Sequence, residues 1–237
     1  MSSVLDEKYG YIKRNTDEIR RKISDAAASC GRDASEISIV AAVKYADVDE
    51  VNYLHTVCGI TDIGENRVQQ LLDRYDALDK EGLKIHFIGT LQTNKVKYIV
   101  DKVDMIHSLD SEKLAAEINS RCEKIGKQMD VLCEINSGRE ENKSGIMPED
   151  AEAFCLSLQK YGNLRMRGFM TMAPVCEKKE DYCKFFSETV KLVLDIWQKK
   201  LHNIERPIIS MGMSGSFEEA IACGSTAVRI GRGFFVK

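Results

Sequence analysis

The sequence is poor in several features that would assign it to a specialised class of protein. It has 3 prolines and 1 tryptophan among 237 residues, and no segment approaches the run of about 18 apolar residues needed to cross a membrane. Lysine and arginine number 34 against 37 aspartates and glutamates, so the formal net charge of -3 provides no basic field for nucleic acid or anionic lipid. The amino-terminal segment MSSVLDEKYGYIKRNTDEIRRKI lacks the apolar core of a signal peptide. We therefore expect a soluble, cytoplasmic protein that binds neither nucleic acid nor membrane.

The cysteines show no arrangement for metal binding. There are 8 of them, scattered along the chain, with no C-x-x-C pair and no cysteine–histidine spacing typical of a zinc site. We expect reduced thiols and no metal.

Short apolar runs alternate with amphipathic stretches after an amino-terminal helix. That helix is predicted over about 5–29, where Leu5, Tyr9, Ile12, Ile19 and Ile23 recur at helical spacing among charges. Strands are then predicted at 38–43, 60–64, 84–89, 105–108, 129–136, 165–172, 207–210 and 226–231. Helical stretches separate them, among them ENRVQQLLDRYDAL, TNKVKYIVDK and FEEAIACG.

Strands that alternate with helices require a parallel sheet, because each parallel neighbour needs a crossover connection. Eight such units after one helix match the count of a (β/α)8 TIM barrel. The alternative, an open doubly wound sheet, would carry a G-x-G-x-x-G turn after its first strand, where this sequence reads AAVKYADV. We therefore predict an α/β fold in a single domain, 1–237, with the extra helix in 1–30 and the barrel in 38–235.

Glycine-rich turns follow the last two predicted strands. SMGMSGS (210–216) comes after the seventh strand, and IGRG (230–233) comes at the end of the eighth. In barrels the carboxyl ends of the strands form the active face, and the loops after these two strands often bind phosphate. Glycine lets backbone N–H groups approach an anion, and serine hydroxyls add donors. SMGMSGS alone also fits a serine-capped helix, but the two turns together predict a phosphate site.

Lys44 follows the apolar run IVAAV at the end of the first strand. Partial burial there would favour the neutral amine, a nucleophile able to form a Schiff base. The alternative is a solvated lysine at the exit of the strand. Together with a phosphate site in the same mouth, the lysine suggests a phosphorylated aldehyde, of which pyridoxal phosphate is the common one. A barrel that binds another phosphorylated metabolite without a covalent bond is a further alternative.

Arg229 lies two residues before Gly231, within the apolar run AVRIG. One interpretation is a salt bridge to a carboxylate of the barrel. If the phosphate of a pyridoxal group lies at Gly231, Arg229 is instead placed to donate to the ring nitrogen. A guanidinium cannot accept a proton, so the ring nitrogen would stay unprotonated and the ring would be a weaker electron sink.

Several segments between residues 39 and 235 resemble, in order, those of the pyridoxal phosphate homeostasis protein family. They are VAAVKYADVDEV, DIGENRVQQLL, IHFIGTLQTNKVKYIV, IHSLDSEKLAAEI, EINSGREENKSGI, MRGFMTMAP, ISMGMSGSFEEAIACG and VRIGRGFF. The resemblance implies a barrel like the amino-terminal domain of alanine racemase, with pyridoxal 5′-phosphate bound covalently to Lys44. It also implies Asn66 and His86 near the cofactor and Arg229 on the pyridine nitrogen. The residues that it implies around the phosphate are Ser210, Met213, Ser214, Gly231 and Arg232. His86 also fits a buried, hydrogen-bonded core residue.

The sequence departs from the family pattern beside two of these positions. Val43 stands where a serine usually precedes the lysine, which removes a hydroxyl and leaves Lys44 in register. Ser216 stands where an aspartate is common, so the carboxylate that could cap a helix or contact the loop there is missing.

The resemblance leaves two classes of function. The first is a non-catalytic protein that holds pyridoxal phosphate as a Schiff base, supplies it to apoenzymes and takes part in intracellular vitamin B6 homeostasis. The alternative is a small pyridoxal-dependent amino-acid racemase or related enzyme. In alanine racemase the second acid–base residue comes from another domain and a partner subunit, and the eight units leave no room for that domain here. We therefore expect a monomer without turnover of its own, with pyridoxal enzymes as transient partners.

Overall fold

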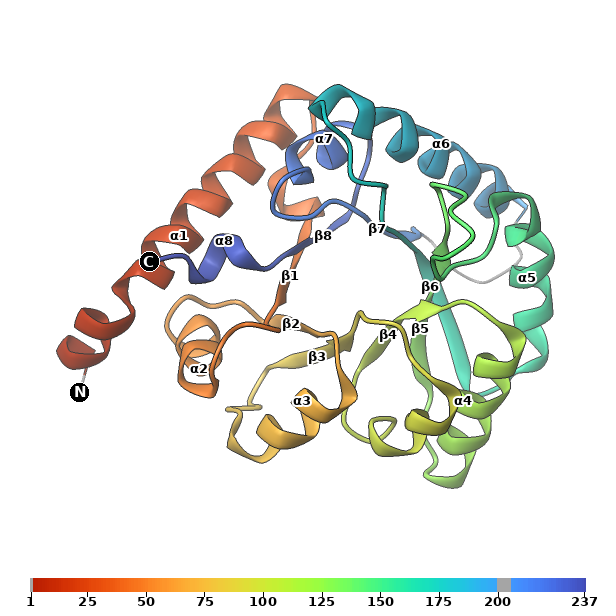
Figure 1. Cartoon of the computed structure of the whole chain (residues 1–237), viewed down its shortest axis with the longest axis horizontal. Coiled ribbons are helices and arrows are strands. Elements are labelled where there is room, and N and C mark those ends of the chain that lie inside the picture. The colour runs from red at the N-terminus through yellow and green to blue at the C-terminus, as the bar shows by residue number, and fades with distance from the viewer. Residues whose placement is uncertain (1, 200–205) are drawn as a thin grey trace.

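Parallel strands close into a barrel in the computed structural model, which describes residues 2–199 and 206–237. The strands are β1 (Ser38–Ala42), β2 (Asp62–Glu65), β3 (Lys84–Phe87), β4 (Met105–Leu109), β5 (Met129–Ile135), β6 (Leu164–Thr171), β7 (Ile208–Ser210) and β8 (Ala227–Ile230). Each pairs with the next in chain order, and β8 pairs with β1 to close the ring (Figure 1). The predicted (β/α)8 barrel is confirmed, and every predicted strand overlaps an observed one.

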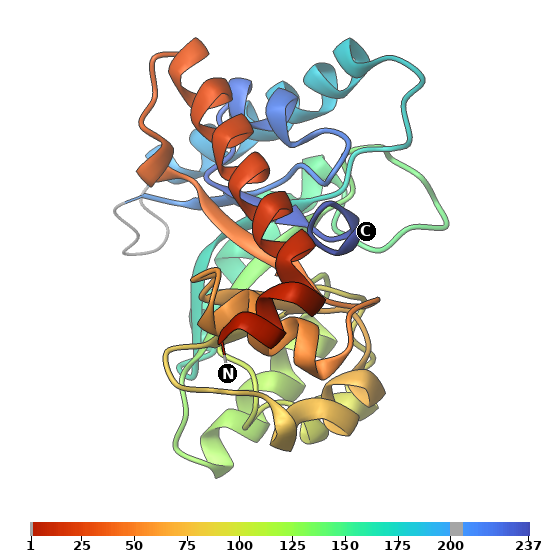
Figure 2. The same ribbon diagram turned by 90° about the vertical axis from the view of Figure 1, so that its left-hand side faces the viewer.

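Helices surround the ring of strands. The first, α1 (Ser2–Ser29), precedes the barrel and packs against α2 (Val48–Thr56), α7 (Phe217–Ala222) and α8 (Arg232–Phe235). The others are α3 (Val68–Arg74), α4 (Glu112–Lys124), α5 (Ala151–Ser157) and α6 (Lys179–Gln198). Figure 2 shows α1 running diagonally across the outside, with the carboxyl terminus beside it. No helix within the described ranges is long and apolar enough to span a bilayer.

The predicted amino-terminal helix is amphipathic and covers the side of the barrel where β8 meets β1. Ile12, Ile19 and Ile23 are buried and belong to a cluster that includes Ile230 and Phe234. Each fully buried isoleucine contributes about 1.5–3 kcal/mol relative to an exposed one. The helix therefore supports the carboxyl end of β8 and the short helix that follows it.

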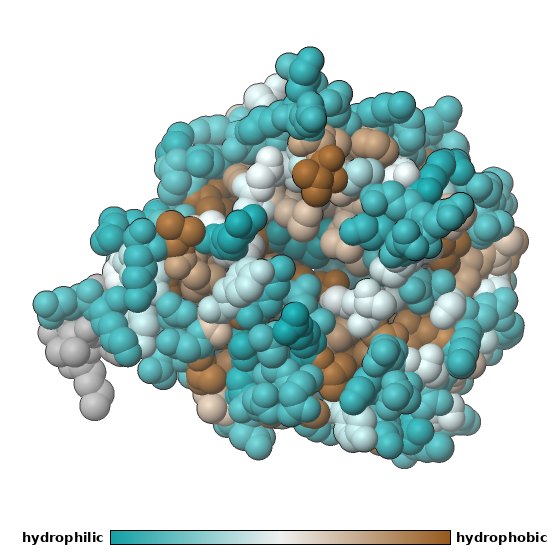
Figure 3. Space-filling view, viewed as in Figure 1, coloured by the Kyte–Doolittle hydropathy of each residue, from teal (hydrophilic) through white to brown (hydrophobic). Residues whose placement is uncertain are grey.

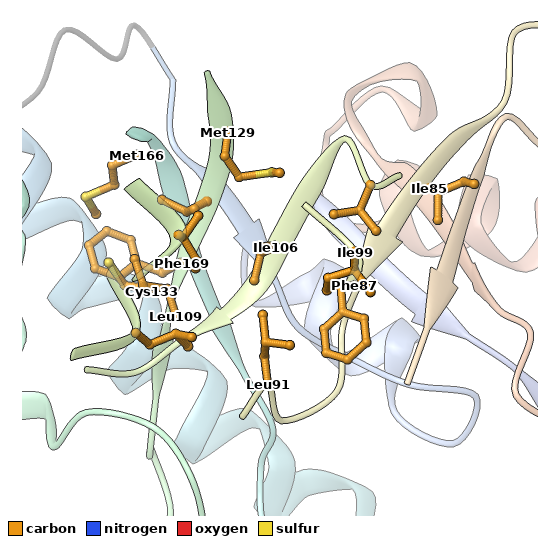
Figure 4. Close-up of a cluster of buried hydrophobic side chains, with 14 of the residues drawn as sticks. Ile85, Phe87, Leu91, Ile99, Ile106, Leu109, Met129, Cys133, Met166 and Phe169 are labelled. Carbon is orange, nitrogen blue, oxygen red and sulfur yellow. The ribbon is translucent and has the colours of Figure 1, made fainter. Parts of the chain in front are cut away.

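The main hydrophobic core lies between the outer face of the sheet and the surrounding helices. Phe87, Ile106 and Phe169 project from β3, β4 and β6 into this layer and are buried (Figure 4). Residues at every second position of a strand share one face, so the alternate positions face the barrel interior. This outer layer leaves the interior free to carry polar side chains.

One predicted helix takes a different form. The segment TNKVKYIVDK was expected to be α-helical, but residues Thr93–Tyr98 form a 3-10 helix followed by turns. Val96, Ile99 and Val100 are buried, so the apolar spacing that suggested a helix is kept although the segment is a 3-10 helix only up to Tyr98. The short helix α8 was not predicted, because four residues are too few to show helical periodicity.

Candidate functional site

The carboxyl ends of β1 and β8 lie side by side at the mouth of the barrel. Ala41 of β1 pairs with Ile230 of β8. A methyl group placed on Gly231 would lie 3.1 Å from the carbonyl oxygen of Ala42 and 3.4 Å from its Cβ. The turn after β8 therefore contacts Ala42, which lies two residues before Lys44. Figure 3 views the molecule from the same side as Figure 1.

A hydrogen bond joins the two glycine-rich turns. The N–H of Gly231 donates to Ser214 Oγ at 3.2 Å, so the loops after β7 and β8 meet. Gly212, at the start of the first turn, has a φ of +89°, and a methyl group there would lie 2.6 Å from the Cβ of Ala220. Only glycine fits both the backbone conformation and the space at this position. Two of the five residues predicted to surround a phosphate, Ser214 and Gly231, are thus in direct contact.

The other residues predicted around the phosphate lie at different depths. Met213 is 43% exposed on the first turn, and Arg232 is exposed at the start of α8. Ser210 is fully buried in the barrel interior below them. The hydroxyl of Ser216 accepts the N–H of Met213 at 3.3 Å and does not cap α7, so it stabilises the turn itself.

Lys44 lies in the turn after β1, and its side chain is exposed. Its Nζ lies 4.9 Å from the centre of the Tyr45 ring. The expectation of partial burial is wrong for this structure, because β1 ends at Ala42 and the lysine extends beyond the buried part of the strand. Its backbone is held from outside by α3, where Gln70 Nε2 donates to the Lys44 carbonyl at 3.2 Å.

A buried ion pair lies directly behind this turn. Arg74 donates to the Val43 carbonyl at 3.0 Å, and its Nε lies 3.5 Å from Glu65 Oε1. The Glu65 side chain has no exposed surface, and its carboxylate has no hydrogen-bond partner among the residues that the structure describes. Burial raises the pKa of Glu65 to about 7, against the opposing charge of Arg74.

Arg229 lies inside the barrel and is 4% exposed. Its Nη1 donates to the carbonyl and to the hydroxyl of Ser210, both at 2.8 Å, and its Nη2 donates to the Thr171 carbonyl at 2.8 Å. No described carboxylate lies within salt-bridge distance of it, so the salt-bridge interpretation is not what the structure shows. Burial lowers the pKa of Arg229 to about 10, while the charge of Glu134 opposes this shift. The guanidinium therefore remains protonated at neutral pH.

Asn66 lies at the carboxyl end of β2, beside the end of β3. A methyl group on Gly89 would lie 2.1 Å from the Asn66 carbonyl oxygen, so the two chains touch here. Asn66 Oδ1 is buried and has no hydrogen-bond partner among the described residues.

His86 lies deeper in the interior, toward the amino ends of the strands. Its Nε2 lies 3.0 Å from Asp62 Oδ1, and its Nδ1 lies 2.8 Å from His107 Nε2. It lines a cavity of about 420 Å³ together with Ser38, Lys84 and Ala227, which stand at the amino ends of their strands. The structure shows a hydrogen-bonded core histidine and gives no support to a direct contact of His86 with a group at the mouth.

Comparison with known proteins assigns the chain to a family. The model for the alanine racemase N-terminal domain matches residues 13–236. A pyridoxal phosphate homeostasis protein from Aquifex aeolicus is 39% identical over 213 residues, which is 90% of this chain and 92% of that protein. The chain belongs to the pyridoxal phosphate homeostasis protein family.

Solved structures agree with this family. PipY from Synechococcus elongatus with PLP bound has a TM-score of 0.78 and 25% sequence identity, over 90% of this chain and 100% of that chain. An alanine racemase from Clostridium difficile has a TM-score of 0.72 at 17% identity and shows the shared fold. This chain matches 57% of the length of that racemase.

Sequence reasoning missed several polar residues of the interior in this member of the homeostasis protein family. His107 is 1% exposed and Glu134 is 3% exposed, and neither was a candidate. Glu134 Oε1 accepts a hydrogen bond from Ser144 at 2.9 Å, while Oε2 has no partner among the described residues. Strand alternation could have indicated His107. It stands two positions after Met105 and therefore on the same face of β4, and Met105 pairs with His86.

Proposed function

We propose that this protein holds pyridoxal 5′-phosphate as a Schiff base on Lys44 and serves intracellular vitamin B6 homeostasis without catalytic turnover of its own. The observation that carries the proposal is the contact of Gly231 with Ala42, which brings the Ser214–Gly231 turns beside the strand that ends at Lys44. An anion site and an amine thus share one mouth. The names of the relatives and the PLP-bound PipY structure support the same assignment.

The residues at the mouth fit a phosphorylated pyridine aldehyde. Ser214 Oγ accepts a hydrogen bond from the Gly231 N–H, and a phosphate oxygen would accept from the same N–H. Gly231 lacks a side chain that would fill the space beside Ala42. We assign the phosphate to these two residues, with Met213 and Arg232 on the same turns, and we place Ser210 below them as a partner of Arg229.

Arg229 supplies the group for the ring nitrogen. A guanidinium carries five N–H donors, and three hydrogen bonds to Ser210 and Thr171 account for part of them. The remaining donors have no protein acceptor among the described residues. Because Arg229 donates and cannot accept a proton, a pyridine nitrogen facing it stays unprotonated. Such a ring withdraws electrons weakly, which suits storage of the cofactor better than chemistry on amino acids.

Lys44 supplies the covalent link. Its side chain is exposed on a turn whose backbone is held by Gln70 and Arg74. As the free amine, Nζ would add to the aldehyde carbon of pyridoxal phosphate, with the release of one molecule of water as the carbon–nitrogen double bond forms. The same bond is reversible by water or by another amine. This property suits a protein that supplies pyridoxal enzymes in the cytoplasm.

The test is loading of the purified protein with pyridoxal phosphate. We expect about one equivalent with Schiff-base absorbance for the parent, and loss of that absorbance in Lys44→Ala. Lys97→Ala is the matched control, because Lys97 Nζ also lies 4.9 Å from a tyrosine ring. Full Schiff-base absorbance in Lys44→Ala would remove the proposal.

Turnover distinguishes the homeostasis role from the alternative enzyme. The loaded protein is incubated with single enantiomers of amino acids, and the enantiomer ratio and keto-acid content are followed. We expect no product beyond the amount of protein. Sustained racemisation or transamination that increases with protein concentration would favour the racemase alternative.

A further inference from the structure

A chain of hydrogen bonds crosses the barrel interior from Arg229 to Asp62. Arg229 Nη1 lies 2.8 Å from Ser210 Oγ, and Ser210 Oγ lies 3.3 Å from His107 Nδ1. His107 Nε2 lies 2.8 Å from His86 Nδ1, and His86 Nε2 lies 3.0 Å from Asp62 Oδ1. The chain connects β8, β7, β4, β3 and β2 in turn. It joins the residue proposed to face the cofactor to the cavity at the amino ends of the strands.

At a pH at which both imidazoles are neutral, the chemistry of its two ends gives this chain a single direction. A guanidinium has only donors, so Ser210 Oγ must accept from Arg229. An ionised carboxylate has only acceptors, so His86 Nε2 must donate to Asp62. Burial acts to raise the pKa of Asp62, but hydrogen bonds from His86 and Thr61 hold it below its ordinary value. Asp62 is therefore ionised at neutral pH.

The direction determines the tautomer of both histidines. His86 donates from Nε2, so its Nδ1 accepts the Nε2–H of His107. His107 then has an unprotonated Nδ1, which accepts the hydroxyl proton of Ser210. In this state each of the two imidazoles carries its single proton on Nε2. Burial is the largest cause that lowers the pKa of His107 well below its ordinary value, so this imidazole is neutral at neutral pH.

The cavity end of the chain keeps Asp62 in a charged environment. Lys84, Lys127, Arg165 and Arg167 line that cavity together with Asp104 and Asp130. Arg165 is paired with Asp130 at 2.7 Å, while the Asp104 carboxylate accepts the N–H of Ile85 at 2.7 Å. The acceptor role of Asp62 is thus supported by cations that share its cavity.

We infer that His107 and His86 are positioning residues for Arg229, acting through Ser210. Because the Ser210 hydroxyl donates to His107, its lone pairs are turned toward the guanidinium, and Nη1 gains the second of its two bonds to Ser210. Together with the Thr171 carbonyl this fixes the plane of the guanidinium. The use of this arrangement rests on the proposed function, since Arg229 is the group assigned to the ring nitrogen. The hydrogen-bond geometry itself does not depend on it.

The first experiment reads the tautomers without reference to the cofactor. The full chain, labelled with 15N in its 4 histidines, is studied by NMR at about pH 8, above the ordinary histidine pKa of about 6.5. His86→Gln and His107→Gln assign the signals. We expect one protonated Nε2 and one unprotonated Nδ1 for each of the two residues. An imidazolium or an Nδ1–H tautomer at either residue would overturn the inference.

The second experiment tests the effect on a bound cofactor. His107→Leu removes both hydrogen bonds, and we expect the pyridoxal phosphate concentration for half-saturation to rise roughly tenfold, with a shifted absorption band. His107→Gln has an amide oxygen for Ser210 and an amide N–H for His86. We therefore expect its half-saturation concentration to stay within about threefold of the parent's and its absorption band to match the parent's. His55→Leu is the control, because His55 also makes two hydrogen bonds but lies on α2 outside the barrel interior.

The outcomes separate this inference from the proposed function. If the parent does not take up pyridoxal phosphate, the proposed function fails, and the NMR result still decides the hydrogen-bond chain. If the parent loads and His107→Leu loads equally with an unchanged spectrum, the positioning role is refuted. The same holds if His107→Gln behaves like His107→Leu, or if His55→Leu shifts the spectrum by the same amount.

Discussion

Glu65 gives the protein a pH-dependent stability that one substitution should remove. The carboxylate is fully buried behind the Lys44 turn, with Arg74 as its charged neighbour and no hydrogen-bond partner within 2–199 and 206–237. Its pKa rises from an ordinary 4.5 to about 7 in the folded protein, mainly because burial disfavours the charged form. The folded state therefore binds this proton more tightly than the unfolded state. The resulting stabilisation is fully present below about pH 4.5 and is lost as the pH rises through about 7.

The size of the effect follows from the pKa difference. A rise of about 2.5 in pKa, at about 1.36 kcal/mol for each pKa unit, makes the folded state about 3 kcal/mol less stable when Glu65 is ionised than when it is protonated. Glu65→Gln keeps the shape and stays neutral. The difference in unfolding free energy between variant and parent should therefore move by about 2.5 kcal/mol in favour of the variant between about pH 5 and about pH 8.

The assay is urea denaturation of both proteins at the two pH values. Comparing the change with pH cancels other titrating groups, and it also cancels any pH-independent effect of the glutamine amide. Glu188→Gln, on the exposed face of α6, is the control and should follow the parent at both pH values. If Glu65→Gln also follows the parent, the carboxylate is not held in the environment described here.

Further predictions concern the turn after β7. Gly212→Ala should lower the unfolding free energy by more than about 1 kcal/mol, because the φ of +89° and the contact with Ala220 exclude a methyl group, and thermal denaturation checks this. Gly215→Ala is its control in the same turn, since a methyl there meets nothing within 4 Å; equal losses in the two variants would contradict the reasoning. Ser214→Ala removes the hydroxyl that meets the Gly231 N–H, and we expect roughly tenfold weaker retention of pyridoxal phosphate, measured by equilibrium dialysis. Unchanged retention would place the phosphate elsewhere.

The strands could be predicted because each is a short apolar run between turn signals, and alternation with helices allows few topologies. SIVAAV and β1 (Ser38–Ala42) agree to within one residue. That single residue matters for function, since it leaves Lys44 in an exposed turn rather than at a buried strand end. Periodicity locates elements and does not resolve where a strand stops.

Contacts between strands were beyond prediction from the sequence. The pairing of His86 with His107 depends on the register of β3 against β4, and the contact of Ser214 with Gly231 depends on the path of two loops. Glu65 stands beside Asn66 in the sequence, yet its side chain faces α3 outside the barrel. Whether a side chain points into the barrel or outward against the helices decides which of these two surroundings it has.

Chemical trapping of the bond at Lys44 decides whether this lysine carries the cofactor. The protein is loaded with pyridoxal phosphate, reduced with borohydride, digested and analysed by mass spectrometry. We expect a reduced pyridoxal phosphate adduct on the peptide that contains Lys44. Protein that retains the cofactor while the Lys44 peptide remains unmodified would contradict it.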